Sequence, residues 1–193
     1  MIAPDSCCAV VLAAGGGSRF IGSSHKLLAV LDGQPVYRHA LAAVQAAGFA
    51  HVIVVTGAVE LELGDGFQVA HNHRWADGQA GSLQVGIAAA DALGADAVVV
   101  GLADQPFISP HAWVAVASST AAIAVATYNG VRANPVRLHR SVWSDLPHEG
   151  DRGARSLMLA RPELVEEVAC QGSPADIDTM EDLQQWNSST NSP

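Results

Sequence analysis

Glycines and cations stand together near the start of the chain. Residues 15–17 are three consecutive glycines, and Arg19 and Lys26 follow them. Glycine lets backbone N–H groups approach an anion, and Arg and Lys side chains can neutralise phosphate oxygens. The stretch matches neither the G-x-G-x-x-G fingerprint nor the P-loop, because Phe20 takes the last glycine's place and no G-K-[ST] follows. By itself it fits a phosphate site and an ordinary strand–helix turn equally well.

Carboxylates stand beside two later segments. Asp104 comes directly after the apolar run VVVGLA, and Asp176 and Asp178 precede the last helical pattern. Oxygen ligands suit Mg²⁺, which typically takes one or two protein carboxylates together with substrate phosphates. Asp104 could instead form a turn, and Asp178 with Glu181 three residues later also fits a helix N-cap with its capping-box partner.

The segment 71–82 carries further polar and aromatic side chains. His71 and His73 are two apart, but no third ligand follows at a zinc-site spacing. Trp75 is expected in the core rather than as a stacking platform. No G-x-S-x-G elbow surrounds Ser82, so the segment offers no activated nucleophile.

Apolar runs of strand length alternate with helical patterns and would hold these residues at strand ends. Strands are predicted at 7–14, 51–57, 66–71, 96–104, 121–128 and 131–139, and helices at 34–48, 81–94, 109–118, 153–160 and 179–186. Asn129–Gly130 indicates a hairpin turn, and 163–170 fits a strand or a helix. Such alternation predicts a parallel sheet covered by helices on both faces, with ligands at the carboxyl ends of its strands. The glycine and carboxylate segments should therefore meet at one edge.

Composition limits the functions that the chain can have. Its 193 residues are 49% hydrophobic and 15% charged with a net charge of −9, which indicates one globular domain and excludes nucleic acid as a bulk partner. No apolar run approaches ~18 residues, so no membrane contact is predicted. Three cysteines without a C-x-x-C pair indicate a reducing cytoplasm. We expect a folded domain over residues 1–186 and a flexible tail over 187–193.

Seven segments, in this order, resemble the molybdenum cofactor cytidylyltransferase family. They are LAAGGGSRF, HKLL, NHRWADGQAGSLQVGI, LADQP, RANPV, GDRGAR and DIDTMEDL, and they extend from about Val10 to Leu183. The resemblance implies a single three-layer Rossmann-like nucleotidyltransferase domain, α/β with a mostly parallel mixed sheet. It implies Mg²⁺-dependent transfer of CMP from CTP to the phosphate of (molybdenum-)molybdopterin with release of pyrophosphate. Ala14 is typical of the cytidine branch, and its methyl group leaves less room for a purine.

The resemblance also assigns residues to roles. Arg19 and Lys26 would hold the triphosphate, and Asp104 would bind Mg²⁺ with Asp178 as the second metal ligand. The nucleotide-binding residues would be Leu12, Ala13, Ala14, Gly15, Gly16, Gly17, Gly78 and Ser82, and the acceptor-binding residues would be Asp151, Arg152 and Arg155. More residues separate Arg19 from Lys26 than is usual in the family. The role of Lys26 therefore depends on whether its side chain reaches the site.

Two other functions fit the same residues. A cytidylyl-, guanylyl- or uridylyltransferase for another phosphorylated acceptor would use the same nucleotide site. A non-catalytic carrier or chaperone would bind the molybdenum cofactor and hand it to a molybdoenzyme, but it would have little use for unpaired carboxylates. Nucleotidyl transfer needs positioning and charge neutralisation rather than a protein nucleophile, which agrees with the absence of one here.

Overall fold

A seven-stranded sheet forms the centre of the computed structural model, which describes residues 6–21 and 24–190. The strand order is β5-β4-β1-β6-β8-β7-β9. The strands are β1 (Cys7–Ala13), β4 (Val52–Thr56), β5 (Gln68–His71), β6 (Ala97–Leu102), β7 (Ile123–Tyr128), β8 (Val131–His139) and β9 (Val165–Ala169). Only β8 runs antiparallel to its neighbours, so the sheet is mixed and mostly parallel, as predicted.

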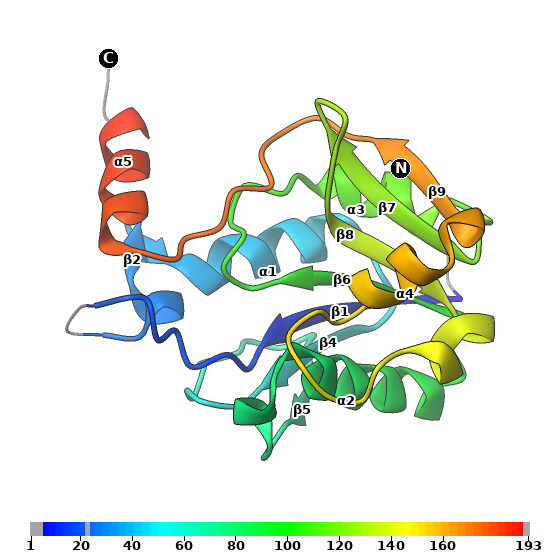
Figure 1. Ribbon diagram of the computed structural model, residues 1–193. Helices are drawn as coiled ribbons and strands as arrows, with labels where there is room; N and C mark the ends of the chain where they lie inside the picture. Colours follow the sequence, from blue (N-terminus) through cyan, green and yellow to red (C-terminus); the bar gives the residue numbers. More distant parts are fainter. Residues whose placement is uncertain (1–5, 22–23, 191–193) are drawn as a thin grey trace.

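Helices cover both faces of the sheet and complete a three-layer α/β domain (Figure 1). One face packs against α1 (Val36–Ala46) and α3 (Pro110–Ala117), and the other against α2 (Gln79–Ala92) and α4 (Arg155–Ala160). Short 3-10 helices join these elements: η1 (Lys26–Leu28), η2 (Trp75–Asp77), η3 (Arg140–Asp145) and η4 (Pro162–Leu164). In the described part of the chain, no helix is long and apolar enough to cross a membrane.

The central strand β1 explains why the first apolar run lacks alternation. All seven of its residues are buried, and successive side chains enter the two cores on opposite faces of the sheet. Val11 packs in the core beneath α1, and Val10 packs in the core beneath α2. A strand covered on both faces needs apolar side chains throughout, which is typical of parallel sheets.

The hairpin predicted at Asn129–Gly130 is present. Asn129 has φ 52° and Gly130 has φ 79°, and the turn joins β7 to β8 with Tyr128 opposite Val131. A left-handed conformation at both turn positions matches the twist of the strands, which is why Asn-Gly predicts this connection.

Some element boundaries differ from the prediction. The segment 163–170 forms part of η4 and then β9, a strand that pairs in parallel with β7. A small hairpin of β2 (Val30–Leu31) and β3 (Gln34–Pro35) is added before α1. The final helix, α5 (Met180–Thr190), continues past Trp186, so part of the predicted tail is helical, and residues 191–193 lie outside the described residues.

The strand order brings the polar segments to one edge. The chain passes from β1 outward to β4 and β5 and then returns to β6 on the other side of β1, which makes a switch point between β1 and β6. The last segment reaches the same edge, because Ile177 N donates a hydrogen bond to Asp104 O (2.9 Å). Ile177 also packs with Phe20 and Leu31 in a small core below α5.

Candidate functional site

The glycine loop after β1 is held against an aromatic ring. Gly17 adopts φ 62°, and its carbonyl accepts a hydrogen bond from Phe20 N (2.9 Å), so the chain turns sharply here. A methyl group built at Gly16 would lie 2.8 Å from Trp75 Cζ3, which is closer than side-chain contacts allow. Gly16 therefore leaves the room that the indole of Trp75 occupies.

His25 ties this loop to the short helix η1. Its Nε2 lies 2.9 Å from Gly15 O, and its Nδ1 accepts from Leu27 N at 3.2 Å. Because Nδ1 accepts, Nε2 carries the proton and the ring is neutral. Burial is the main reason that the pKa of His25 is lowered, and the neighbouring Lys26 adds to the effect. The segment HKLL contains this residue, but the sequence assigned it no role.

Lys26 reaches the carboxylates at the sheet edge. Its Nζ lies 2.5 Å from Asp104 Oδ2 and 2.8 Å from Asp178 Oδ1. Arg19 adds a second cation, with Nη2 at 2.7 Å from Asp178 Oδ2. Two cations and two carboxylates thus form one cluster, although the segment between Arg19 and Lys26 is long and its residues 22–23 lie outside the described residues.

The charges of this cluster support one another. Burial lowers the pKa of Lys26, but the charges and hydrogen bonds of Asp104 and Asp178 outweigh it and leave that pKa above its ordinary value. Burial raises the pKa of Asp178, but Lys26 and Arg19 outweigh it and leave that pKa lowered. Asp176 differs, because partial burial and the negative charge of Asp178 raise its pKa. Asp178 is therefore the better anionic ligand of the two.

The carboxylates fit an oxygen-preferring divalent cation. Asp104 Oδ1 is buried, and none of the described residues gives it a hydrogen bond. Asp104 and Asp178 also converge on a single cationic point, which Lys26 Nζ occupies. The described residues contain no group of three or more His, Cys, Asp or Glu ligands. Two carboxylates are what Mg²⁺ commonly takes from a protein when substrate phosphates complete its shell.

The helix cap beside Asp178 differs from the alternative that the sequence offered. Thr179, rather than Asp178, caps α5, because Thr179 Oγ1 accepts from Asp182 N at 3.1 Å. Asp182 Oδ2 in turn accepts from Thr179 N (2.8 Å) and Asp178 N (3.1 Å). The capping box is therefore Thr179–Asp182, and the interpretation of Asp178 with Glu181 as that pair is wrong. The side chain of Asp178 is left to face Lys26.

A cavity of about 430 Å³ opens beside the glycine loop and the charged cluster. All of the predicted nucleotide-binding and catalytic residues line it: Leu12, Ala13, Ala14, Gly15, Gly16, Gly17, Arg19, Lys26, Gly78, Ser82, Asp104 and Asp178. We call it the nucleotide cavity, after the ligand that the sequence predicts for these residues. Its wall also includes Trp75, which is 37% exposed, so the expectation that Trp75 belongs to the core is wrong.

Gly78 allows a distant loop to dock on the start of α2. Its φ is 112°, and a methyl group there would lie 2.6 Å from the backbone C and O of Gly150. Ala80 N donates to Gly150 O at 2.9 Å, which holds the loop in place. This loop, residues 146–154, joins η3 to α4. A side chain at position 78 would push it away from the cavity.

Ser82 lies in the nucleotide cavity with its hydroxyl already oriented. Asn72 Nδ2 donates to Ser82 Oγ at 2.9 Å, and both residues are buried. The hydroxyl proton of Ser82 is therefore free to donate in another direction. His71 and His73 lie nearby with ring centroids 4.5 Å apart, but they gather no further ligand within the described residues.

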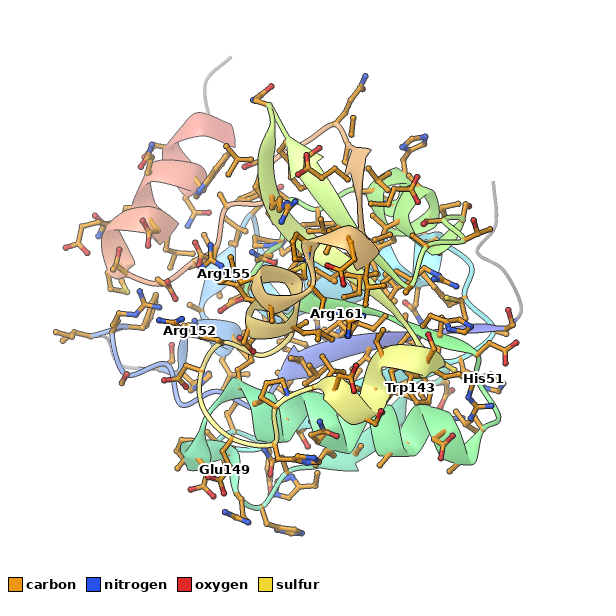
Figure 2. The ribbon with its side chains drawn as sticks, turned by 45° about the vertical axis from the view of Figure 1, so that its right-hand side comes forward. His51, Trp143, Glu149, Arg152, Arg155 and Arg161 are labelled. Atoms are coloured by element: carbon orange, nitrogen blue, oxygen red, sulfur yellow. The ribbon has the colours of Figure 1, made fainter. Side chains whose placement is uncertain are left out.

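A second cavity of about 420 Å³ adjoins the first, and we call it the acceptor cavity, after the ligand predicted for Asp151, Arg152 and Arg155. Four residues line both cavities: Leu12, Gln79, Leu102 and Asp151. Arg152 and Arg155 also line it, and Figure 2 shows them where the 146–154 loop meets α4, away from Glu149 beside α2. The structure thus brings together the three residues predicted to bind the acceptor.

Further residues of the acceptor cavity had escaped assignment. Arg132 and Asn134 line it from β8, and Gln105 lines it from the segment after β6. Asn134 Nδ2 donates to Gln105 Oε1 at 2.8 Å, so the RANPV and LADQP segments meet here. Val125, Met158 and other apolar side chains form much of the remaining wall. RANPV and LADQP are both among the segments that resemble the family. That resemblance was the signal from which a role for these three polar residues could have been predicted.

The chain matches a family model and a known relative over most of its length. Residues 9–166 match the model of the MobA-like NTP transferase domain. The "Purine catabolism protein PucB" of Bacillus subtilis (strain 168) is 30% identical over 189 residues, which cover 89% of this chain and 92% of PucB.

Solved structures agree with the family match. Rv0371c from Mycobacterium tuberculosis H37Rv is 27% identical over 94% of this chain and 97% of its own, with a TM-score of 0.79, and it has also been solved in complex with manganese. A Methanothermobacter nucleotidyl transferase, Mth528, is 24% identical over 95% and 96% of the two chains, with a TM-score of 0.80. These likenesses confirm the predicted Rossmann-like nucleotidyltransferase fold. The chain therefore belongs to the MobA-like NTP transferase domain family and is a nucleotidyltransferase.

Proposed function

We propose that this nucleotidyltransferase uses Mg²⁺ to transfer CMP from CTP to the phosphate of a molybdopterin-type acceptor, releasing pyrophosphate. One observation carries the proposal. The nucleotide cavity and the acceptor cavity meet at shared walls, next to a cluster of two cations and two carboxylates. A donor triphosphate and an acceptor phosphate could therefore approach each other with their charges neutralised.

The chain's own residues supply positioning and electrostatics. The glycine loop and Lys26 would lie beside the triphosphate, and Arg19, whose side chain is 73% exposed, would bind its outer phosphates. Mg²⁺ held by Asp104 and Asp178 would neutralise charge that develops on the departing pyrophosphate. The acceptor phosphate attacks the α-phosphorus in line while pyrophosphate leaves, so no protein nucleophile is required. The manganese complex of Rv0371c supports a divalent-metal requirement.

The acceptor cavity suits an anion joined to an apolar body. Arg152 and Arg155 can hold phosphate by paired N–H donors, and the walls around Met158 and Val125 are apolar. Asp151 lies where the two cavities join. A pterin ring system carrying a terminal phosphate combines these properties, whereas a small sugar phosphate would leave the apolar wall exposed to water.

Ala14 supports the choice of a pyrimidine nucleotide. It is buried at the end of β1, and a methyl group at Gly57 would lie 2.8 Å from Ala14 Cβ. The Ala14 methyl group therefore packs closely against Gly57, and Ala14 also lines the nucleotide cavity. We expect Ala14→Gly to increase the use of GTP relative to CTP.

The proposal is tested by pyrophosphate release from the purified protein with Mg²⁺, molybdopterin and each of the four nucleoside triphosphates. We expect acceptor-dependent release with CTP. Arg152→Ala should raise the KM for the acceptor roughly 10–100-fold, the range for one lost charge-assisted contact, without changing the KM for CTP.

Other outcomes distinguish the alternatives. Turnover with a sugar phosphate but not with molybdopterin would favour another acceptor, and preference for GTP would overturn only the base assignment. Binding of the cofactor without turnover, unaffected by Asp104→Asn, would favour the carrier or chaperone that delivers it to a molybdoenzyme.

A further inference from the structure

Trp75 is the only aromatic residue among the described residues that line the nucleotide cavity. It begins the short helix η2, which connects β5 to α2. The residue remains 37% exposed in the structure, although tryptophan carries a large apolar ring. An exposed indole in the wall of a cavity is available to a ligand.

The indole is held in place by the backbone around it. A methyl group at Gly57 would lie 2.7 Å from Trp75 Cβ, and one at Gly16 would lie 2.8 Å from Trp75 Cζ3. Both neighbours must therefore be glycine for the ring to fit between the end of β4 and the glycine loop. The turn beneath it is also fixed, because Asp77 N donates to Arg74 O at 3.0 Å. A ring fixed in this way loses little conformational entropy when a ligand packs on it.

The distribution of charge in the cavity leaves one place for an uncharged, flat group. Arg19, Lys26, Asp104 and Asp178 form the charged end, where a triphosphate and its metal ion would be neutralised. Asp176 lies beside Asp178 at this end. The remaining wall consists of small or apolar side chains, Gln79, Asp151 and backbone, with Trp75 as its only π surface in the described chain. The base of a nucleotide must lie away from the charged end and would meet this surface.

We propose that Trp75 is the stacking platform for the nucleobase. This inference rests on the proposed function, because it takes the cavity to be a nucleoside triphosphate site. Every base has a π face, so stacking on Trp75 adds affinity for all nucleotides and does not choose among them. The choice is left to groups that contact the edge of the base, such as Ser82.

Binding measurements with two ligands separate stacking from support of the glycine loop. The dissociation constants of CTP and of inorganic tripolyphosphate are measured by calorimetry with Mg²⁺ for the wild type, Trp75→Leu and Trp75→Phe. We expect Trp75→Leu to weaken CTP binding roughly 10-fold, equivalent to about 1.4 kcal/mol, and to leave tripolyphosphate binding unchanged. Trp75→Phe keeps a π face and should retain most of the CTP affinity.

Fluorescence gives a second test that does not depend on Trp75→Leu being folded. CTP should quench the tryptophan emission of the wild type and of Trp143→Phe, and should not quench that of Trp75→Phe. Trp143 is a matched control, because its indole donates to Leu138 O, stacks with Arg140 and lies outside the nucleotide cavity. Tripolyphosphate, which has no base, should leave the wild-type emission unchanged.

Three results would overturn the inference. Equal loss of CTP and tripolyphosphate affinity in Trp75→Leu would mean that Trp75 only supports the loop. Unchanged CTP affinity in that variant, together with quenching that persists in Trp75→Phe, would mean that the base lies elsewhere. If the wild type bound none of the four nucleotides, the proposed function and this inference would both be wrong, whereas the first two results leave the proposed function intact.

Discussion

Replacing Lys26 by methionine removes the cation that separates two carboxylates at the centre of the site. Lys26 Nζ lies 2.5 Å from Asp104 Oδ2 and 2.8 Å from Asp178 Oδ1. The side chains of Lys26, Asp104 and Asp178 are only 12%, 15% and 14% exposed. In Lys26→Met, the two carboxylates would face each other across an apolar side chain, and only Arg19 would still pair with Asp178.

The size of the effect follows from this burial. Removing one partner of a buried ion pair destabilises a protein by about 3–5 kcal/mol. The remaining Arg19 contact and the residual exposure place Lys26→Met at the lower end, at about 3 kcal/mol without metal. For a domain of this size, that loss lowers Tm by roughly 6–12 °C. Mg²⁺ should restore about 2.7 kcal/mol at a hundredfold excess over its dissociation constant, because the carboxylates no longer bind Lys26.

Thermal unfolding in EDTA and in Mg²⁺ measures both effects. Lys26→Met should unfold at a lower temperature than wild type in EDTA, and Mg²⁺ should raise its Tm more than it raises that of wild type. Arg140→Met is the control, because Arg140 pairs with Asp91 on the surface, with exposures of 45% and 58%. Such a pair contributes about 0–1 kcal/mol. Equal Tm values for Lys26→Met and wild type in EDTA, or equal shifts with Mg²⁺, would refute this reasoning.

Three further predictions concern neighbouring residues. Gly78→Ala should lower the free energy of unfolding by roughly 2 kcal/mol in urea titrations, because its methyl group would collide with Gly150. Gly64→Ala is the control and should leave that free energy unchanged, because a methyl group there meets nothing within 4 Å. Asp182→Ala should speed hydrogen exchange at the start of α5 by removing about 1 kcal/mol of capping, and an equal effect of Glu181→Ala would contradict the assigned cap. The loss of unfolding free energy caused by His25→Ala should become smaller as the pH falls from 7 to about 5. The pKa of His25 is below its ordinary value of 6.5, and protonation removes the contact that the neutral ring makes with Leu27 N. A loss that does not change with pH would contradict this.

Local patterns in the sequence predicted most of the fold. The uninterrupted apolar runs form β1 and β6, which are buried on both faces. Burial on both faces requires apolar side chains throughout a strand, which is why these runs predicted the two strands. Ser109 caps α3 and Asn129–Gly130 forms the hairpin turn, because each depends only on adjacent residues. The position of polar residues after these strands also predicted which segments would meet.

Contacts between distant segments account for what the sequence could not predict. Asp178 and Thr179 are both acceptable helix caps. In the structure Thr179 caps α5 together with Asp182, while Asp178 pairs with Lys26, which lies far away in the chain. Trp75 is a large apolar residue of the kind expected in a core, but its ring packs against Gly16 at the cavity wall. The backbone of Gly150 packs against Gly78 only because position 78 has no side chain. A motif in one segment of the sequence does not show which distant segment packs there.

Transfer of the nucleotide itself tests the central claim most directly. CTP labelled on its α-phosphate is incubated with Mg²⁺, molybdopterin and either the wild type or Asp104→Asn, and the label in the acceptor is measured. We predict that the wild type moves the α-label to the acceptor while a γ-label appears in pyrophosphate, and that Asp104→Asn does so roughly 100-fold more slowly. Absence of α-label transfer from any of the four nucleotides, or equal rates for the two proteins, would contradict the account.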